Sequence, residues 1–328
     1  MTNLAKPIIA FLGPAEAEDV VREVVGDRFE VRSLAPDAED LSRSLLGATV
    51  FLDASMQVHL TGQMIEQASE LRLVVAATTG ADHIDQEALR RRSIPLLTLK
   101  GQNQVLRDLT SAAEHSWLLL MACARKLCAA RAHVVAGGWD RSAFAGIMLR
   151  GKTLGIVGCG RIGGWMGRYA EAFGMVSIGY DPFLSEWPRN IRPVTLENLL
   201  AASDFITLHV HLTADTHRMI DRERIAQMKP GCIFINTSRG DLVDEHALLK
   251  ALASGRIAAV GLDVLQGEPD IEKSPLRKYA IDHDNVIITP HIGGFSPDAV
   301  RTVVRFSAER IVRYFEALGQ DRVNETTG

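Results

Sequence analysis

The first hundred residues alternate short apolar runs with stretches of helical periodicity. Four of the runs have the length of buried strands: residues 8–12, 48–52, 71–76 and 94–98. The stretches between them, such as residues 17–25, repeat apolar residues at the three- and four-residue spacing of an amphipathic helix. Strands that alternate with helices are typical of a parallel sheet covered by helices. We therefore expect a parallel α/β lobe.

A long helical pattern rich in Ala and Leu follows at residues 108–136 and ends at Gly137-Gly138, a helix-terminating signal. We interpret it as a connector. A second alternating series comes after it, and six apolar runs are predicted to be strands: residues 153–157, 175–180, 205–209, 232–236, 257–262 and 286–289. Six strands with helices between them are what a doubly wound dinucleotide-binding domain requires.

One more helical pattern, at residues 297–318, comes after these strands. Because the second lobe already has its six strands, we expect this helix to return to the first lobe. The predicted fold is thus α/β with two lobes, and 328 residues are enough for two cores. A doubly wound Rossmann domain is expected at residues 105–294, including the connector helix. A smaller, flavodoxin-like parallel α/β domain is expected at residues 1–104, completed by residues 295–328.

Composition and charge exclude several kinds of partner. A formal net charge of −4 and a pI of about 6.2 do not indicate the positively charged surface that binds nucleic acid or an anionic membrane. Because the sequence shows neither a leader-like N-terminus nor an apolar run of membrane-spanning length, we expect a cytoplasmic protein. The four cysteines show no CxxC spacing, and His209 and His211 have no third ligand near them in the sequence. We therefore expect neither a metal site nor a disulfide.

The strongest local motif is a glycine turn between a predicted strand and a helical stretch, made by Gly158, Gly160 and Gly163. In this context the first glycine permits a tight turn, the second lets a pyrophosphate approach the backbone, and the third lets helix and strand pack closely. Asp181 follows the next strand, where a carboxylate accepts from ribose hydroxyls and repels a 2′-phosphate. The structural alternative for Asp181 is a turn residue before Pro182. The pattern predicts an NAD site.

Three polar residues downstream of the turn have the chemistry of hydride transfer to an oxo acid. Arg239 lies in Asn-Thr-Ser-Arg-Gly, Glu268 in Gly-Glu-Pro and His291 in Thr-Pro-His-Ile-Gly-Gly. A guanidinium can hold a carboxylate, and an imidazole beside a carboxylate can hold or release a proton. Singly, each residue has a structural alternative: a strand-end cap, a turn residue before a proline, or a satisfied histidine. Together with the glycine turn, they indicate a dehydrogenase for 2-oxo and 2-hydroxy acids.

These motifs closely resemble those of the D-isomer-specific 2-hydroxyacid dehydrogenases, over residues 71–306. The resemblance implies that His291 is the general acid that protonates the substrate carbonyl oxygen, and the general base in the reverse direction. It implies that Glu268 pairs with the other ring nitrogen, stabilises the charged imidazole and fixes its orientation. Arg239 is then expected to hold the substrate carboxylate and the 2-oxygen. The implied cofactor is NAD, and the implied partner is a small 2-oxo or 2-hydroxy acid.

The same resemblance assigns further contacts. Residues 78–83 match the family's substrate loop, where backbone N–H groups bind a carboxylate. The substrate-binding residues expected there, besides Arg239, are Thr79, Gly80 and Ala81. Asp263 is expected to orient the nicotinamide amide. The other residues expected to contact the cofactor are Arg161, Ile162, His209, Thr237, Ser238, Gly293 and Gly294.

Other functions within the same family stay open as alternatives. The family includes NAD-sensing corepressors that keep the catalytic trio, as well as phosphite- and formate-type dehydrogenases. The resemblance argues against formate, because formate dehydrogenases of this fold place Gln at the position of Glu268. It also implies a homodimer formed through the connector.

The sequence departs from the family at residues 101–114, which are longer than the usual run. We hypothesise that Lys100 or Arg107 binds a second anionic group there, against the simpler alternative of a solvated loop. The sequence does not determine which 2-hydroxy acid is the substrate or which direction of the reaction is physiological.

Overall fold

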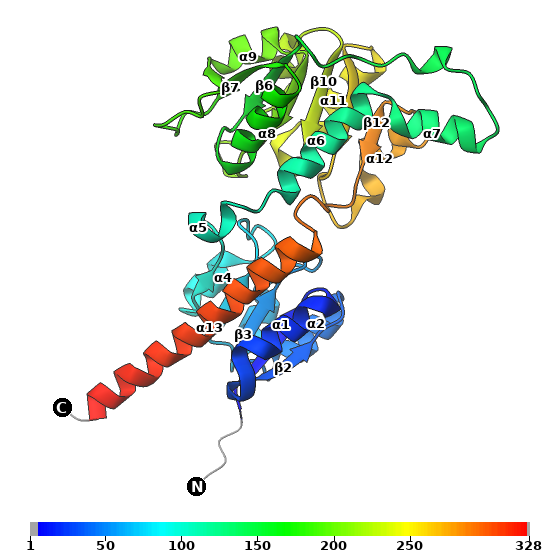
Figure 1. Ribbon diagram of the computed structural model, residues 1–328. Helices are drawn as coiled ribbons and strands as arrows, with labels where there is room; N and C mark the ends of the chain where they lie inside the picture. The colour runs from blue at the N-terminus through cyan, green and yellow to red at the C-terminus, as the bar shows by residue number, and fades with distance from the viewer. Residues whose placement is uncertain (1–5, 327–328) are drawn as a thin grey trace. The chain divides into compact units, whose positions relative to one another are not determined.

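Segments from near both ends of the chain fold into one unit. The computed structural model describes residues 6–326, with side chains as far as residue 318, and divides the chain into two units. The first consists of the chain up to Leu109 and of residues from Ser296 on, and the second of residues 110–295. Each unit has its own parallel sheet with helices around it (Figure 1). This confirms the predicted α/β fold class.

The first unit has a five-stranded parallel sheet in the order β2-β1-β3-β4-β5, the flavodoxin-like order. Its strands are β1 Ile8–Leu12, β2 Glu30–Ser33, β3 Val50–Asp53, β4 Leu73–Ala76 and β5 Leu96–Leu97. Its helices are α1 Ala15–Val25, α2 Ala38–Leu45, α3 Gly62–Gln67, α4 Gln86–Arg91, α5 Asn103–Leu106 and α13 Pro297–Thr326. In the register of the central strands, Val50 stands opposite both Ile9 and Leu73.

The last helix, α13, belongs to this unit because it packs along α1 (Figure 1). Val304, Ala308 and Ile311 of α13 are fully buried, in one cluster with Ile9 of β1. Apart from Asp53 at the end of β3, the central strands are apolar, because helices cover both faces of the sheet. The pattern does not predict edge strand β2, because only Val31 of its four residues is buried. None of the described helices, α13 included, is long and apolar enough to cross a membrane.

The second unit has a seven-stranded parallel sheet in the order β12-β11-β10-β9-β6-β7-β8. Counted from β6, this is the Rossmann order with one more strand at its edge. The strands are β6 Thr153–Val157, β7 Val176–Tyr180, β8 Arg192–Pro193, β9 Phe205–Leu208, β10 Cys232–Asn236, β11 Ile257–Leu262 and β12 Val286–Ile288. The helices are α6 Ser111–Ala124, α7 Leu127–Val135, α8 Arg161–Ala172, α9 Leu196–Ala202, α10 Arg222–Gln227, α11 Glu245–Ala253 and α12 Pro275–Ala280. Short 3₁₀ turns occur in both units at Gly26–Arg28, Ser142–Phe144, Gly240–Leu242 and Ile271–Lys273.

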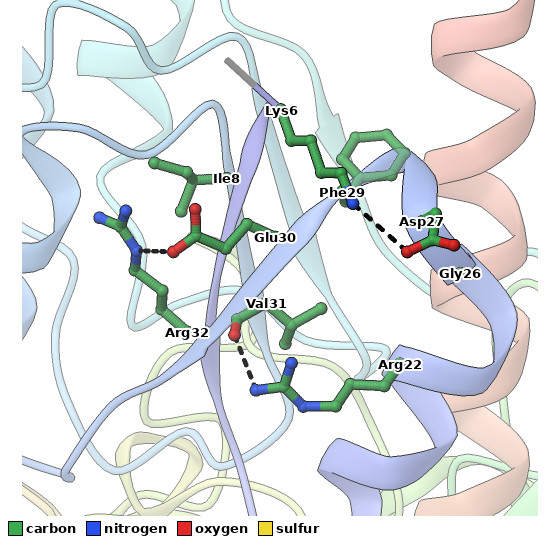
Figure 2. A pocket seen from close by; sticks show the side chains of 9 residues that line it. All are labelled: Lys6, Ile8, Arg22, Gly26, Asp27, Phe29, Glu30, Val31 and Arg32. Carbon is green, nitrogen blue, oxygen red and sulfur yellow. Dashed lines mark hydrogen bonds and ion pairs between the residues drawn. The ribbon is translucent and has the colours of Figure 1, made fainter.

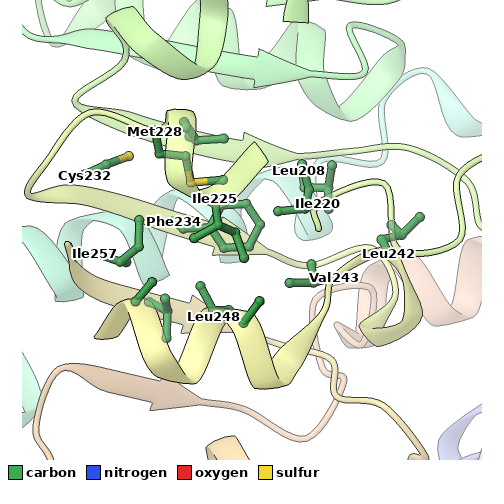
Figure 3. Close-up of a cluster of buried hydrophobic side chains, with 14 of the residues drawn as sticks. Leu208, Ile220, Ile225, Met228, Cys232, Phe234, Leu242, Val243, Leu248 and Ile257 are labelled. Atoms are coloured by element: carbon green, nitrogen blue, oxygen red, sulfur yellow. The ribbon is translucent and has the colours of Figure 1, made fainter. Parts of the chain in front are cut away.

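The core of the second unit fixes this sheet from both faces. On one face Phe234 of β10 is fully buried in one cluster with Leu208, Ile225 and Leu248, which come from β9, α10 and α11 (Figure 3). On the other face Ile235 lies in a cluster with side chains of α6 and α8. Burying each such side chain stabilises the fold by about 1.5–3 kcal/mol. The strand ends are therefore held rigidly.

The prediction of a single connector helix at residues 108–136 was wrong. α6 ends before Arg125 and α7 starts after Lys126, whose φ of 51° is left-handed. The N–H of Lys126 donates to the carbonyl of Cys123 at 3.2 Å, which ends the first helix. The break is made by Lys rather than by Gly or Pro, the residues that signal a break in a sequence. The second helix ends before Gly137, whose φ is 89°, as the Gly-Gly signal predicts.

A buried pair ties two loops together at the carboxyl edge of the first sheet. His83 Nε2 lies 2.7 Å from Asp53 Oδ2, and the two residues are 6% and 1% exposed. Asp53 Oδ1 accepts hydrogen bonds from the backbone N–H groups of Ser55 and Met56. The pair therefore joins the loop after β3 to the loop after β4.

Replacing Asp53 with Ala is expected to destabilise the first unit. The change leaves His83 buried without its partner, and breaking a buried pair from one side costs about 3–5 kcal/mol. Urea unfolding measures the loss, and hydrogen exchange of β1, β3 and β4 assigns it to this unit. The control is Asp27→Ala, because Asp27 is fully exposed in its pair with Lys6 and should matter little. Equal stability of the two variants would contradict this account.

Candidate active site

The predicted catalytic trio and most of the predicted cofactor residues follow strands of the second sheet. Because all its strands are parallel, their carboxyl ends meet at one edge. The glycine turn follows β6, Asp181 follows β7 and His209 follows β9. Arg239, Glu268 and His291 follow β10, β11 and β12, which are neighbours in the sheet. The sheet thus gathers at one edge residues that are far apart in the sequence.

Two glycines of the turn are needed for close packing. Gly158 has a φ of 87°, and a Cβ there would lie 2.4 Å from the carbonyl oxygen of His209 at the end of β9. A Cβ on Gly163 would lie 2.1 Å from the carbonyl oxygen of Gly158. The first glycine therefore makes the tight turn, and the third lets α8 pack onto it.

Gly160 differs, because no atom lies within 4 Å of the place where its Cβ would be. It precedes α8, whose N-terminus has no side-chain cap and whose first turn has no acidic residue. This open backbone fits a pyrophosphate, since free N–H groups and the helix dipole attract anions. Arg161 and Ile162 are the first residues of the helix and are half-buried. Burial lowers the pKa of Arg161.

Asp181 links the glycine turn to the end of β7. Its Oδ2 accepts a hydrogen bond from the N–H of Cys159 at 2.9 Å, and its Oδ1 accepts one from the N–H of Phe183 at 3.0 Å. The second bond is the local turn around Pro182, whereas the first reaches the dinucleotide turn itself. Each carboxylate oxygen keeps a second lone pair, so the half-buried Asp181 has acceptor capacity for a ribose hydroxyl.

The carbonyl oxygen of His209 lies beside the glycine turn, 2.4 Å from the place where a Cβ on Gly158 would be. Its Nε2 lies 2.8 Å from the hydroxyl of Thr207. Nδ1 is shielded from solvent and has no hydrogen-bond partner among the described residues. Burial lowers the pKa of His209 to about 3, so the ring is neutral near pH 7. A contact between this ring and the cofactor stays a prediction.

His291 and Glu268 form the central contact of the site. His291 Nδ1 lies 2.8 Å from Glu268 Oε1, and the two side chains are 27% and 29% exposed. His291 has a φ of 54°, an uncommon value for a residue with a Cβ. Its N–H donates to the carbonyl of Asp263 at 2.9 Å, which holds this conformation. Because Nδ1 faces Glu268, Nε2 is the ring nitrogen left for a substrate.

Arg239 is placed by the loop after β10. The side-chain oxygen of buried Asn236 accepts from the N–H of Ser238 at 3.0 Å, and its side-chain NH₂ group donates to the carbonyl of Arg239 at 2.8 Å. Gly240 follows, and a Cβ there would lie 2.1 Å from the backbone of Leu265. The Arg239 loop therefore packs directly on the loop that leads to Glu268, and only a glycine permits that approach.

Sequence reasoning missed Glu245, the first residue of α11, which supports the loop of Glu268. Its buried carboxylate accepts from the N–H of Gln266 at 2.7 Å and from the hydroxyl of Ser274 at 3.0 Å. Burial raises the pKa of Glu245 despite these hydrogen bonds. A glutamate in the first turn of a helix is common for electrostatic reasons, so the sequence carries no signal that sets it apart.

Asp263 is 1% exposed and faces the loop after β12. Its Oδ1 accepts from the hydroxyl of Thr289 at 2.5 Å and the N–H of Ile292 at 2.9 Å, and its Oδ2 accepts from the N–H of Gly293 at 2.7 Å. Burial acts to raise the pKa of Asp263, but these hydrogen bonds and one from His115 outweigh it and lower the pKa. Its expected role toward the nicotinamide amide stays a prediction.

The hydroxyl groups expected on the nicotinamide side also have partners within the protein. The Thr237 hydroxyl lies 2.7 Å from that of Ser116 on α6, and the Ser238 hydroxyl donates to the carbonyl of Leu208 at 2.7 Å. Gly294 is exposed. These bonds fix the loop after β10, and contact with the cofactor stays a prediction for all three residues.

The predicted substrate loop follows β4 in the first unit. The hydroxyl of Thr78 donates to the carbonyl of Gly80 at 2.6 Å, and the N–H of Leu99 donates to the carbonyl of Thr78 at 2.9 Å. Within residues 6–326, the backbone N–H groups of Thr79, Gly80 and Ala81 make no hydrogen bond. Consecutive free amides of this kind form an anion-binding nest, which suits a carboxylate.

A cavity of about 740 Å³ in the first unit lies away from these residues, beside β1 and along β2 (Figure 2). Four of its charged side chains form two pairs, Lys6 with Asp27 and Arg32 with Glu30. None of the predicted site residues lines it, so it is not a candidate site. In the part of the chain that the structure describes, no group of three His, Cys, Asp or Glu residues could hold a metal ion.

Similarity to known proteins agrees with this geometry. Residues 117–293 match the family model of the NAD-binding domain of D-isomer-specific 2-hydroxyacid dehydrogenases. The chain is 36% identical over 293 residues to hydroxypyruvate reductase from Thermotoga maritima, covering 89% of this chain and 92% of that protein. It is 37% identical over 265 residues to D-3-phosphoglycerate dehydrogenase from Archaeoglobus fulgidus, covering 80% of this chain and 49% of that protein. This chain therefore matches about half the length of that relative.

A solved structure with a similar fold is that of D-lactate dehydrogenase from Aquifex aeolicus complexed with NAD and lactic acid. It matches with a TM-score of 0.81 and 27% identity, covering 97% of this chain and 98% of that chain. The chain therefore belongs to the family of D-isomer-specific 2-hydroxyacid dehydrogenases, NAD-dependent oxidoreductases that act on the CH–OH group of 2-hydroxy acids.

Proposed function

We propose that this enzyme catalyses reversible hydride transfer between NADH and a small 2-oxo acid, with His291 as the general acid and base. The observation that carries the proposal is the 2.8 Å contact between His291 Nδ1 and Glu268 Oε1. This pair lies at the same sheet edge as the glycine turn and Asp181. A proton donor at the edge that binds the dinucleotide is the arrangement that hydride transfer to a carbonyl needs.

The proton is transferred between His291 Nε2 and the substrate oxygen. Glu268 accepts from Nδ1–H and thereby fixes the orientation of the ring. Nε2–H then donates to the carbonyl oxygen of the substrate as that oxygen gains negative charge. In the reverse direction the neutral Nε2 takes the hydroxyl proton. NADH, when bound, supplies the hydride.

Two groups of this chain suit the carboxylate of the substrate. The guanidinium of Arg239 offers a planar fork of donors that matches a carboxylate, and its positive charge also polarises a neighbouring carbonyl. The free amides of Thr79, Gly80 and Ala81 offer a second anion site in the other unit. We assign a substrate-binding role to Arg239 in the second unit and, separately, to this loop in the first unit.

The phosphates of the cofactor are assigned to the glycine turn and to the first turn of α8, including Gly160, Arg161 and Ile162. The cofactor's adenine-side ribose is assigned to Asp181. Support comes from the open space over Gly160 and from the uncapped N-terminus of α8.

We also propose a homodimer in the cytoplasm. The connector and the segment after it expose large apolar side chains, which are typical of an interface. These residues are Leu127, Val134, Val135, Trp139 and Met148. None of the four cysteines forms a disulfide, which is typical of a protein in a reducing compartment.

The substrate class is tested by following NADH consumption with glyoxylate, hydroxypyruvate, pyruvate, 3-phosphohydroxypyruvate and bulkier 2-oxo acids. Turnover of at least one of the small acids is expected. Tight binding of NADH without turnover of any acid would contradict the proposal and favour an NAD-sensing binding protein.

Replacing His291 with Ala is expected to lower kcat by about 10²–10⁴-fold, because the carbonyl oxygen loses its proton donor. The affinity for NADH, measured by fluorescence titration, is expected to change little. His283→Ala is the matched control, since His283 is an exposed histidine of the same unit. An unchanged kcat in His291→Ala would remove this residue from the mechanism.

Replacing Asp181 with Asn is expected to weaken the preference for NADH over NADPH by at least about tenfold, because the negative charge that repels a 2′-phosphate is lost. The Asn side-chain oxygen can still accept the hydrogen bond from Cys159, so the glycine turn should keep its shape. The measurement is kcat/KM with each cofactor, and the exposed Asp282→Asn serves as control. If the preference stays the same, Asp181 does not select the cofactor.

The proposed dimer predicts a sedimenting mass of twice 35.9 kDa. The pair of substitutions Val135→Glu and Trp139→Glu should shift the protein toward monomer, because burying two new charges in an apolar interface is unfavourable. Sedimentation velocity measures both. A wild-type monomer, or an unaffected dimer in the double variant, would count against this interface.

A further inference from the structure

His115 lies on α6 and has no part in the mechanism above, yet it reaches the active-site loop. Its Nε2 lies 2.8 Å from the hydroxyl oxygen of Thr289 and 3.2 Å from Asp263 Oδ1. Its side chain is 11% exposed. The ring also packs near Gly293, where a Cβ would lie 3.6 Å from His115 Cδ2. One face of this loop therefore rests against α6.

The direction of these hydrogen bonds follows from the number of protons available. The Thr289 hydroxyl has one proton, which it donates to Asp263 Oδ1 at 2.5 Å. Its oxygen can therefore only accept from His115, and the Asp263 carboxylate is an acceptor as well. The proton of the His115 ring must lie on Nε2. His115 thus donates to a pair of oxygens, the hydroxyl oxygen of Thr289 and Asp263 Oδ1.

Asp263 connects His115 to the loop that carries His291 through hydrogen bonds. Its carbonyl accepts from the N–H of His291, and its carboxylate accepts from the N–H groups of Ile292 and Gly293. Three consecutive peptide N–H groups, those of residues 291–293, therefore donate hydrogen bonds to Asp263. A left-handed residue with a Cβ persists only where its surroundings hold it, and His291 is such a residue.

We infer that His115 is a positioning residue for the catalytic histidine: its Nε2–H holds Thr289 and the Asp263 carboxylate in place, and these hold the backbone conformation of His291. The inference rests on the proposed role of His291. It gives α6 a part in catalysis, because His115 acts on the proton transfer through His291.

The test compares His115→Leu with His115→Gln. Leu removes the donor, and kcat is expected to fall roughly ten- to a hundredfold, because small displacements of a reacting group cost this much. Gln carries an amide N–H at about the reach of Nε2 and is expected to restore most of the activity. Thr289→Val removes the hydroxyl between the two residues with almost no change of shape, and the same loss is expected. His283→Leu is the control.

The decisive measurement repeats the substitution in the His291→Ala background. If His115 acts through His291, His115→Leu should lower kcat no further there, whereas a general structural defect would lower both backgrounds alike. The inference is overturned if His115→Leu keeps its kcat, if His115→Gln is as impaired as His115→Leu, or if the loss persists without His291. If His115→Leu does not fold, Thr289→Val decides by the same criteria. An unchanged kcat in His291→Ala alone would instead refute the proposed function.

Discussion

The parallel direction of all seven strands in the second sheet is the constraint on which the active site depends. Only in a parallel sheet do the loops that follow successive strands emerge at the same edge. The glycine turn, Asp181 and the proposed catalytic trio follow five different strands, and the sheet places them at one edge. The core clusters on both faces hold the strand ends, so the loops start from fixed points.

Buried polar residues hold the loops that follow these strands in fixed conformations. Asn236, Glu245 and Asp263 are each almost fully buried, and each binds backbone groups of a loop that leads to a proposed catalytic residue. A buried polar group is costly without partners, so a fully bonded one strongly favours a single loop conformation. The glycine at position 240 complements them, because it lets the loops of Arg239 and Glu268 touch directly.

The three histidines of this region show how environment separates chemical roles. His209 is shielded, and burial lowers its pKa to about 3, so it stays neutral. His115 donates to Thr289 and Asp263 and is almost enclosed. His291 alone combines a carboxylate partner on Nδ1 with an accessible side chain. In the proposed mechanism, histidine side chains thus serve packing, positioning and proton transfer.

The sequence by itself determined the fold class, most of the strands, the cofactor and the catalytic chemistry. Strands buried on both faces leave continuous apolar runs, and a turn that must admit a pyrophosphate leaves glycines at fixed spacing. The sequence did not reveal edge strand β2, the break at Lys126, or the support given by Glu245 and His115. An edge strand buries too little to leave a pattern. The other features depend on contacts between residues distant in the chain, and such contacts are decided only when the elements pack together.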